Sequence, residues 1–154
     1  MLIWQPVFAA KGAKRLGVRV GNWLTAEQGK RLLMAADEAS LRGRRDYAML
    51  AVLLGCGLRR AELTGLRIED LQLREEHWVI ADLVGKSGHV RTIPMPDWVK
   101  AGVDNWVAAA GITTGPLLRS INKAGRIWGN GFSPKVIWGV VKDKAASCEL
   151  LRRS

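Results

Sequence analysis

The sequence predicts an α+β domain that is mainly α-helical, with a small β-hairpin or three-stranded sheet. Helix starts are clearly marked near Thr25 and Ser133, and the segment 44–56 is long and apolar. Between them, residues 77–93 read as two short strands around a glycine-rich turn. With 154 residues, the chain is long enough for one domain with its own hydrophobic core.

The first helix begins after Thr25, where the sequence Thr-Ala-Glu-Gln forms a capping box. The Thr25 hydroxyl can accept the backbone N–H of Gln28, and the Gln28 side chain can reach back. Leu32, Leu33 and Ala36 follow at helical spacing and supply an apolar face.

The second helix is expected from about residue 44 to 56, and it is apolar nearly all round after Asp46. A helix of this kind belongs at the centre of a core. Gly57 is a plausible C-cap, and residues 58–66 read as a further helical turn or two.

A β-hairpin follows. Residues 77–83 form its first strand, with Trp78 and Ile80 on one face, and residues 90–93 form its second. The turn between them, Gly85-Lys86-Ser87-Gly88, places a lysine at the tip.

Two more helices complete the prediction. The segment 97–111 has helical periodicity and places Trp106 at core spacing. Residues 115–131 are glycine-rich and irregular. The last helix runs from the Ser-Pro start at residue 133 to about 147, with Trp138 also at core spacing.

The net charge of +10 comes from 24 basic and 14 acidic side chains and is unevenly distributed. Residues 1–45 and 111–154 each carry an excess of six positive charges, whereas residues 46–110 carry a net −2. A basic chain of this kind indicates a polyanionic partner, nucleic acid first, although a basic soluble protein without one fits the charge too.

Cysteine spacing and hydropathy exclude several classes of protein. The two cysteines, Cys56 and Cys148, have no metal-type or disulfide-framework spacing. Because no apolar run reaches the length of a membrane span and no secretory signal is evident, we expect a cytoplasmic location. Residues 1–22 read as a basic linker or arm that is either disordered or in contact with DNA, and residues 23–154 as the folded domain.

Two motifs carry the chemistry. The first is Gly57-Leu58-Arg59-Arg60-Ala61-Glu62-Leu63, followed by Leu66 and Glu69-Asp70, and the second is Gly85-Lys86 with Arg91 and Pro94 behind it. Their order, separation and elements resemble the first half of the catalytic domain of tyrosine recombinases, also called phage integrases. The resemblance covers roughly residues 23–148.

In that family a tyrosine attacks a DNA phosphodiester, and arginines stabilise the charge that develops on the phosphate. The resemblance implies that Arg59 is the first such arginine and that Lys86 is the general acid for the leaving oxygen. It also suggests that Glu62 orients active-site groups. No metal or cofactor is expected.

The resemblance adds three candidate DNA-backbone contacts: Arg60, Arg67 and Arg91. Each has an ordinary alternative. Arg60 fits a surface salt bridge equally well, and Arg67 and Arg91 fit a solvated face. Likewise, Arg59 and Glu62 would suit an exposed helix start, and Lys86 an ordinary turn.

The second half of the family pattern is not found. No His-x-x-Arg occurs, and the single tyrosine, Tyr47, lies twelve residues before Arg59 in the apolar helix. We therefore expect a truncated integrase-like domain, lacking its C-terminal half, that binds double-stranded DNA but does not cleave it alone. The alternative is a non-catalytic DNA-binding or protein-interaction module that modulates an intact recombinase. Self-association through an exposed apolar face is a further expectation.

Overall fold

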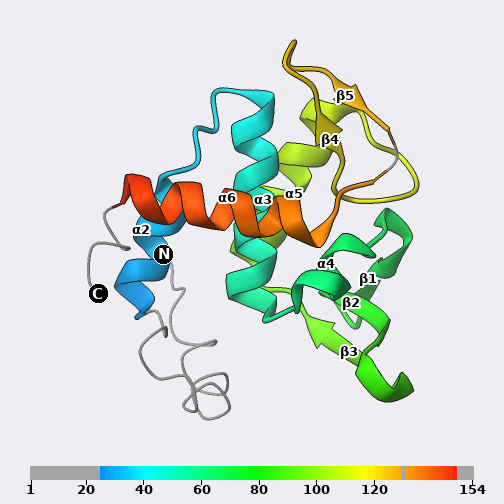
Figure 1. Ribbon diagram of the computed structural model, residues 1–154. Coiled ribbons are helices and arrows are strands. Elements are labelled where there is room, and N and C mark those ends of the chain that lie inside the picture. Colours follow the sequence, from blue (N-terminus) through cyan, green and yellow to red (C-terminus); the bar gives the residue numbers. More distant parts are fainter. Residues whose placement is uncertain (1–24, 130, 149–154) are drawn as a thin grey trace.

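The computed structural model describes residues 25–129 and 131–148. Helices surround the central helix α3, and a three-stranded sheet lies to one side (Figure 1). The predicted class, mainly helical with a small sheet, is confirmed. The expected basic arm over residues 1–22 lies outside the described residues.

Helix α2 (Ala26–Met34) begins with the predicted capping box. The Gln28 N–H donates to Thr25 Oγ1 at 3.1 Å, and the Thr25 N–H donates to Gln28 Oε1 at 2.8 Å. Leu32 and Leu33 are buried against the core, as their spacing predicted.

Helix α3 (Leu41–Cys56) starts earlier than expected because Ser40 is its N-cap, with Oγ accepting the Gly43 N–H at 2.9 Å. Gly57 ends the helix in the left-handed region, at φ 68°. From residue 48 to 52 every side chain is buried, which confirms α3 as the centre of the core.

Helix α5 (Asp97–Ala110) packs along α3. At Gly102 a Cβ would lie 2.8 Å from the Tyr47 ring. At Gly55 of α3 a Cβ would overlap Val99 Cγ2, so these two glycines allow the helices to lie close together. Trp106 is fully buried, as predicted, and its indole N–H donates to the Leu117 carbonyl at 2.9 Å.

The sheet is three-stranded and antiparallel in the order β1 (Leu71–Arg74), β2 (His77–Val84), β3 (Val90–Pro94). Strand β1 reaches β2 through a two-residue turn, Glu75-Glu76, in which both residues have positive φ. This backbone is typical of type I′ turns, which favour asparagine and glycine, so the sequence carried no turn signal here.

Strand β2 contains a bulge. Ile80 pairs with Ile93 and Leu83 with Arg91, so the two residues between them on β2, Ala81 and Asp82, lie opposite the single residue Thr92. Asp82 has φ 51°. The extra residue bends β2 and so changes the direction of the outer end of the hairpin.

A buried ionic cluster joins α3 to α6 (Pro134–Ser147). Arg45 and Asp46 are each about 3% exposed, and two guanidinium nitrogens of Arg45 donate to Asp46 Oδ1 at 3.0 and 3.1 Å. Lys144 of α6 lies 3.8 Å from Asp46 Oδ2. The Arg45 guanidinium also lies over the Phe132 ring at 4.8 Å.

Helix α6 has its Ser133 cap and first-position proline as predicted. The core position expected for Trp138 is wrong: this side chain is 50% exposed. The buried face of α6 runs through Ile137 and Ala145, one residue round the helix, so Trp138 points outward. A two-stranded ladder, β4 (Ser120–Ile121) with β5 (Ile127–Trp128), precedes the helix.

Within 25–129 and 131–148, no helix is long and apolar enough to cross a membrane. Across the same ranges, no three histidine, cysteine or acidic side chains gather as a metal ion would require.

Candidate nucleic-acid interface

Arg59 stands at the start of the short helix α4 (Arg60–Thr64), where it is the N-cap residue. Its backbone N–H donates to Glu62 Oε1 at 2.9 Å, so the main chain of Arg59 is fixed by the carboxylate one turn later. Its guanidinium is exposed and makes no hydrogen bond or ion pair with any described residue.

Glu62 links α4 to strand β3. Nη1 of Arg91 donates to Oε2 at 2.8 Å, and Nη2 donates to Oε1 at 3.0 Å. The Glu62 side chain is only 6% exposed, which excludes the solvated-partner interpretation. Burial raises the pKa of Glu62, but the hydrogen bonds from Arg91 and from the Arg59 backbone outweigh it, so the net shift is downward. Glu62 is therefore ionised at neutral pH.

The hairpin turn at Gly85 lies against the Glu62–Arg91 ion pair. Gly85 donates its N–H to the His89 carbonyl at 2.8 Å, and the 3₁₀ turn η3 (Lys86–Gly88) lies between them. The backbone of Lys86 is thereby placed, while its side chain lies outside the described part of the structure. Arg59, Glu62, Arg91 and this turn therefore form one site.

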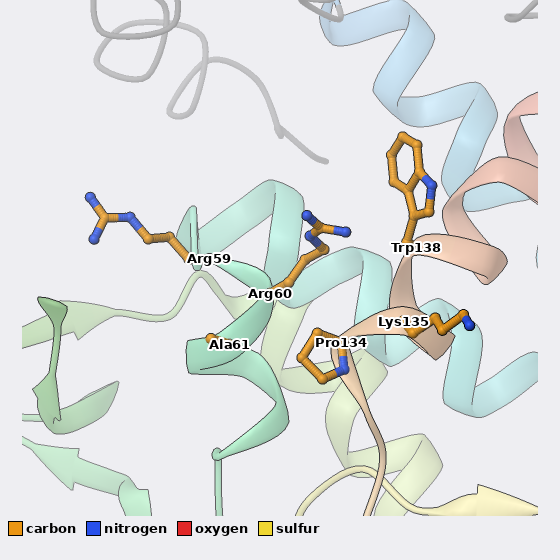
Figure 2. Close-up of a pocket in the computed structure, with 6 residues that line it drawn as sticks. All are labelled: Arg59, Arg60, Ala61, Pro134, Lys135 and Trp138. Carbon is orange, nitrogen blue, oxygen red and sulfur yellow. The ribbon is translucent and has the colours of Figure 1, made fainter.

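A second cluster lies beside it. An open cleft of about 490 Å³ separates α4 from the start of α6, and we call it the α4–α6 cleft. It is lined by Arg59, Arg60, Ala61, Pro134, Lys135 and Trp138. Figure 2 shows Arg60 extending from α4 toward Trp138, while Arg59 extends away from α6.

The α4–α6 cleft is strongly basic. The Arg60 guanidinium lies 5.6 Å from the Trp138 ring centroid, and Lys142 Nζ lies 5.9 Å from it. Among the residues that the structure describes, Arg60, Lys135 and Lys142 have no carboxylate partner. The salt bridge considered for Arg60 is thus not formed with any described residue.

Arg67 lies apart from both clusters. Its Nε pairs with Glu69 Oε1 at 3.1 Å, and both side chains are about half exposed. Glu69 Oε2 also accepts the Gly115 N–H at 2.9 Å, and chiefly for this reason the pKa of Glu69 is lowered. Arg67 therefore belongs to the junction between η2 (Ile68–Asp70) and the loop at Gly115.

Sequence reasoning missed Lys135, Trp138 and Lys142 as members of a site. Their helical spacing close to the Ser-Pro cap was the available signal that they share one face of α6. The apolar periodicity of this helix instead predicts that Trp138 lies in the core. Tyr47 is half-buried between α3 and α5, and burial, together with Glu38, raises its pKa, so its hydroxyl is not activated.

Comparison with known proteins agrees with the geometry. The Phage integrase family matches residues 22–115, more than half of the chain. The chain is 32% identical over 93 residues to a tyrosine recombinase of Pseudothermotoga lettingae, covering 60% of this chain and 30% of that protein. It is 29% identical over 103 residues to the tyrosine recombinase XerC of Pseudomonas syringae pv. tomato, covering 67% and 32%. The chain thus matches less than a third of each relative's length.

Solved structures show the same fold. The crystal structure of XerA recombinase matches 86% of this chain and 45% of its own, with a TM-score of 0.63 and 21% identity. The XerH site-specific recombinase bound to its difH substrate matches 85% of this chain and 38% of its own, with a TM-score of 0.63 and 16% identity.

Proposed function

Because this chain belongs to the phage integrase family, we propose that it binds double-stranded DNA across the α4–α6 cleft and the adjoining Arg59 site. One observation carries the proposal: Arg59, Arg60, Lys135 and Lys142 form no salt bridge with any described carboxylate, and Arg60 and the two lysines gather around Trp138 at the α4–α6 cleft. An arginine engaged by a carboxylate has little charge to offer a phosphate, whereas these four side chains retain theirs.

The expected contact is with the DNA backbone. Guanidinium and ammonium groups neutralise phosphates regardless of sequence and release condensed counterions. The exposed Trp138 adds an apolar surface between the cations on which sugar or base edges can pack. The XerH structure was solved with a DNA substrate bound, which supports a DNA partner for the shared fold.

For the chemistry, we propose the roles that the family implies. Arg59 binds the phosphate that reacts, Lys86 donates a proton to the leaving oxygen, and Glu62 orients the site. Arg67 pairs with Glu69 through Nε alone and is half exposed, so we propose that its terminal nitrogens make a weaker, outer contact with the DNA backbone. The only tyrosine, Tyr47, packs against Gly102 inside the helical layer, so we propose that this chain alone does not form a covalent phosphotyrosyl link.

The test is binding to labelled duplex DNA across a salt series. We expect affinity to fall steeply as salt rises, and Arg59→Ala and Arg60→Ala to weaken binding severalfold. Arg126→Ala is the matched control, because Arg126 is exposed in the β4–β5 turn, at the end of the molecule away from β3 (Figure 1). Equal losses in all three variants would mean that net charge, rather than this face, binds DNA.

Absence of binding at low salt would favour the second candidate, a protein-interaction module that modulates an intact recombinase. Cleavage is tested separately by incubating the chain with duplex DNA and looking for a covalent protein–DNA adduct under denaturing conditions. An adduct would overturn the non-cleaving role.

A further inference from the structure

The Arg91 guanidinium differs from the other cations of the interface because it is already engaged. Both of its terminal nitrogens donate to Glu62, at 2.8 and 3.0 Å, in a two-pronged geometry. The same carboxylate accepts the Arg59 backbone N–H, so three donors from two elements converge on a side chain that is 6% exposed. Releasing Arg91 to a phosphate would leave that buried carboxylate without its cationic partner, which is costly.

The ion pair also supports the hairpin turn directly. A Cβ at Gly85 would lie 2.9 Å from Arg91 Nη1 and 3.4 Å from Glu62 Oε2, so the turn backbone rests against both partners. Beyond it, Val84 and Val90 pair across the hairpin, yet their side chains are 62% and 61% exposed. Among the side chains that the structure describes, no other ion pair joins residues 84–91 to a helix.

We propose that Arg91 is a positioning residue: together with Glu62 it holds the turn that carries Lys86 against α4, beside Arg59. This inference rests on the proposed function, because the turn matters only if Lys86 acts at a DNA phosphate. It assigns to Arg91 a task different from that of a backbone contact such as Arg60. Glu62 and Arg91 are 29 positions apart in sequence, and their ion pair holds the two parts of the site together. One part is the start of α4 with Arg59, and the other is the hairpin turn with Lys86.

The first readout needs no DNA. Hydrogen exchange at the Gly85 amide reports whether its bond to the His89 carbonyl is held closed. We expect exchange to become roughly tenfold faster in Arg91→Gln and in Glu62→Gln, and no faster still in the double variant, because both changes remove one interaction. Arg91→Lys should behave like Arg91→Gln, since lysine keeps the charge but lacks the two-pronged geometry.

The second readout is the salt dependence of duplex binding. A lost phosphate contact lowers the slope of log affinity against log salt by about 1, and we expect this for Arg60→Gln but not for Arg91→Gln. A slope that falls equally in both variants, with Gly85 exchange unchanged, would overturn the proposal. If the wild-type chain binds no DNA, the proposed function fails, while the exchange measurement still decides whether Arg91 holds the turn.

Discussion

Gly85 and Arg91 are in such close contact that a single methyl group would separate them: a Cβ at Gly85 would lie 2.9 Å from Arg91 Nη1. The backbone of Gly85 is extended, with φ −92° and ψ −172°, and any residue can adopt it. The turn conformation therefore allows any residue at this position, and the group that a larger residue would displace is the Arg91 guanidinium.

Replacing Gly85 by alanine should lower the free energy of unfolding by about 1 kcal/mol, because the added methyl group displaces Arg91 from Glu62. Urea unfolding measures the change. In an Arg91→Ala background the same substitution should cost much less, since the conflicting atom is gone. An equal cost in both backgrounds would show that the contact is irrelevant.

The Glu62–Arg91 pair should make stability depend on pH in the acidic range. Since the folded-state pKa of Glu62 is lowered, its contribution is complete above the ordinary glutamate pKa and is lost as the pH falls through the folded value. The urea midpoints of wild type and Glu62→Gln should differ at pH 7 and converge in acid. Glu69, whose pKa is also lowered, is common to both proteins and cancels. A difference that stays constant with pH would contradict the assignment.

Asp46→Ala should be strongly destabilising, by about 3 kcal/mol, because it leaves the Arg45 guanidinium buried without its carboxylate. Asp143→Ala is the control, since Asp143 is exposed on α6 and should change stability by less than about 0.5 kcal/mol. Both are measured by urea unfolding at pH 7. Similar small effects would mean that Arg45 is satisfied by the Arg119 carbonyl and Phe132 alone.

Changing the turn Glu75-Glu76 to Asn-Gly should stabilise the protein by about 1 kcal/mol. Both positions have positive φ, 49° and 69°, which costs ordinary residues energy and suits asparagine and glycine. Thermal unfolding should show a higher midpoint with an unchanged fold. A lower midpoint would indicate that the two glutamates contribute interactions of their own.

Self-association remains a prediction. Apolar side chains are exposed on the hairpin at Val84 and Val90 and on α6 at Val136 and Trp138. We expect the sedimentation coefficient to rise with protein concentration, and Val84→Ser with Val90→Ser to reduce that rise if the hairpin is the contact. A monomer mass that is independent of concentration would rule out association.

Local patterns in the sequence predicted most elements. The Thr25 cap, the apolar part of α3 after Asp46 and the Ser-Pro start of α6 each depend on neighbouring residues, and the structure confirms them. Helix α3 begins three residues before the predicted start, because Ser40 caps it ahead of the apolar run.

Relationships between distant residues were not predictable. The sequence predicts a DNA contact or a solvated face for Arg91, because nothing in its own segment points to Glu62. From the local sequence alone, Arg45 and Asp46 look like charged residues in the exposed first turn of a helix. They are buried because Phe132 and the Arg119 carbonyl, which lie far along the chain, contact Arg45. Trp138 is next to the core residue Ile137 in sequence, and only the packing of α6 against the other helices decides which of the two is buried.

The bulge at Ala81–Asp82 determines which way the Gly85–His89 turn faces. Beyond the bulge, Leu83 still pairs with Arg91 and Val84 with Val90, so the extra residue is accommodated locally and both strands enter the turn in register. An extra residue on one strand bends that strand and increases its twist. Deleting Asp82 would leave Ala81 opposite Thr92 and straighten β2, so the turn backbone would approach the Glu62–Arg91 pair from a different direction. The irregularity therefore determines the angle at which the hairpin meets α4.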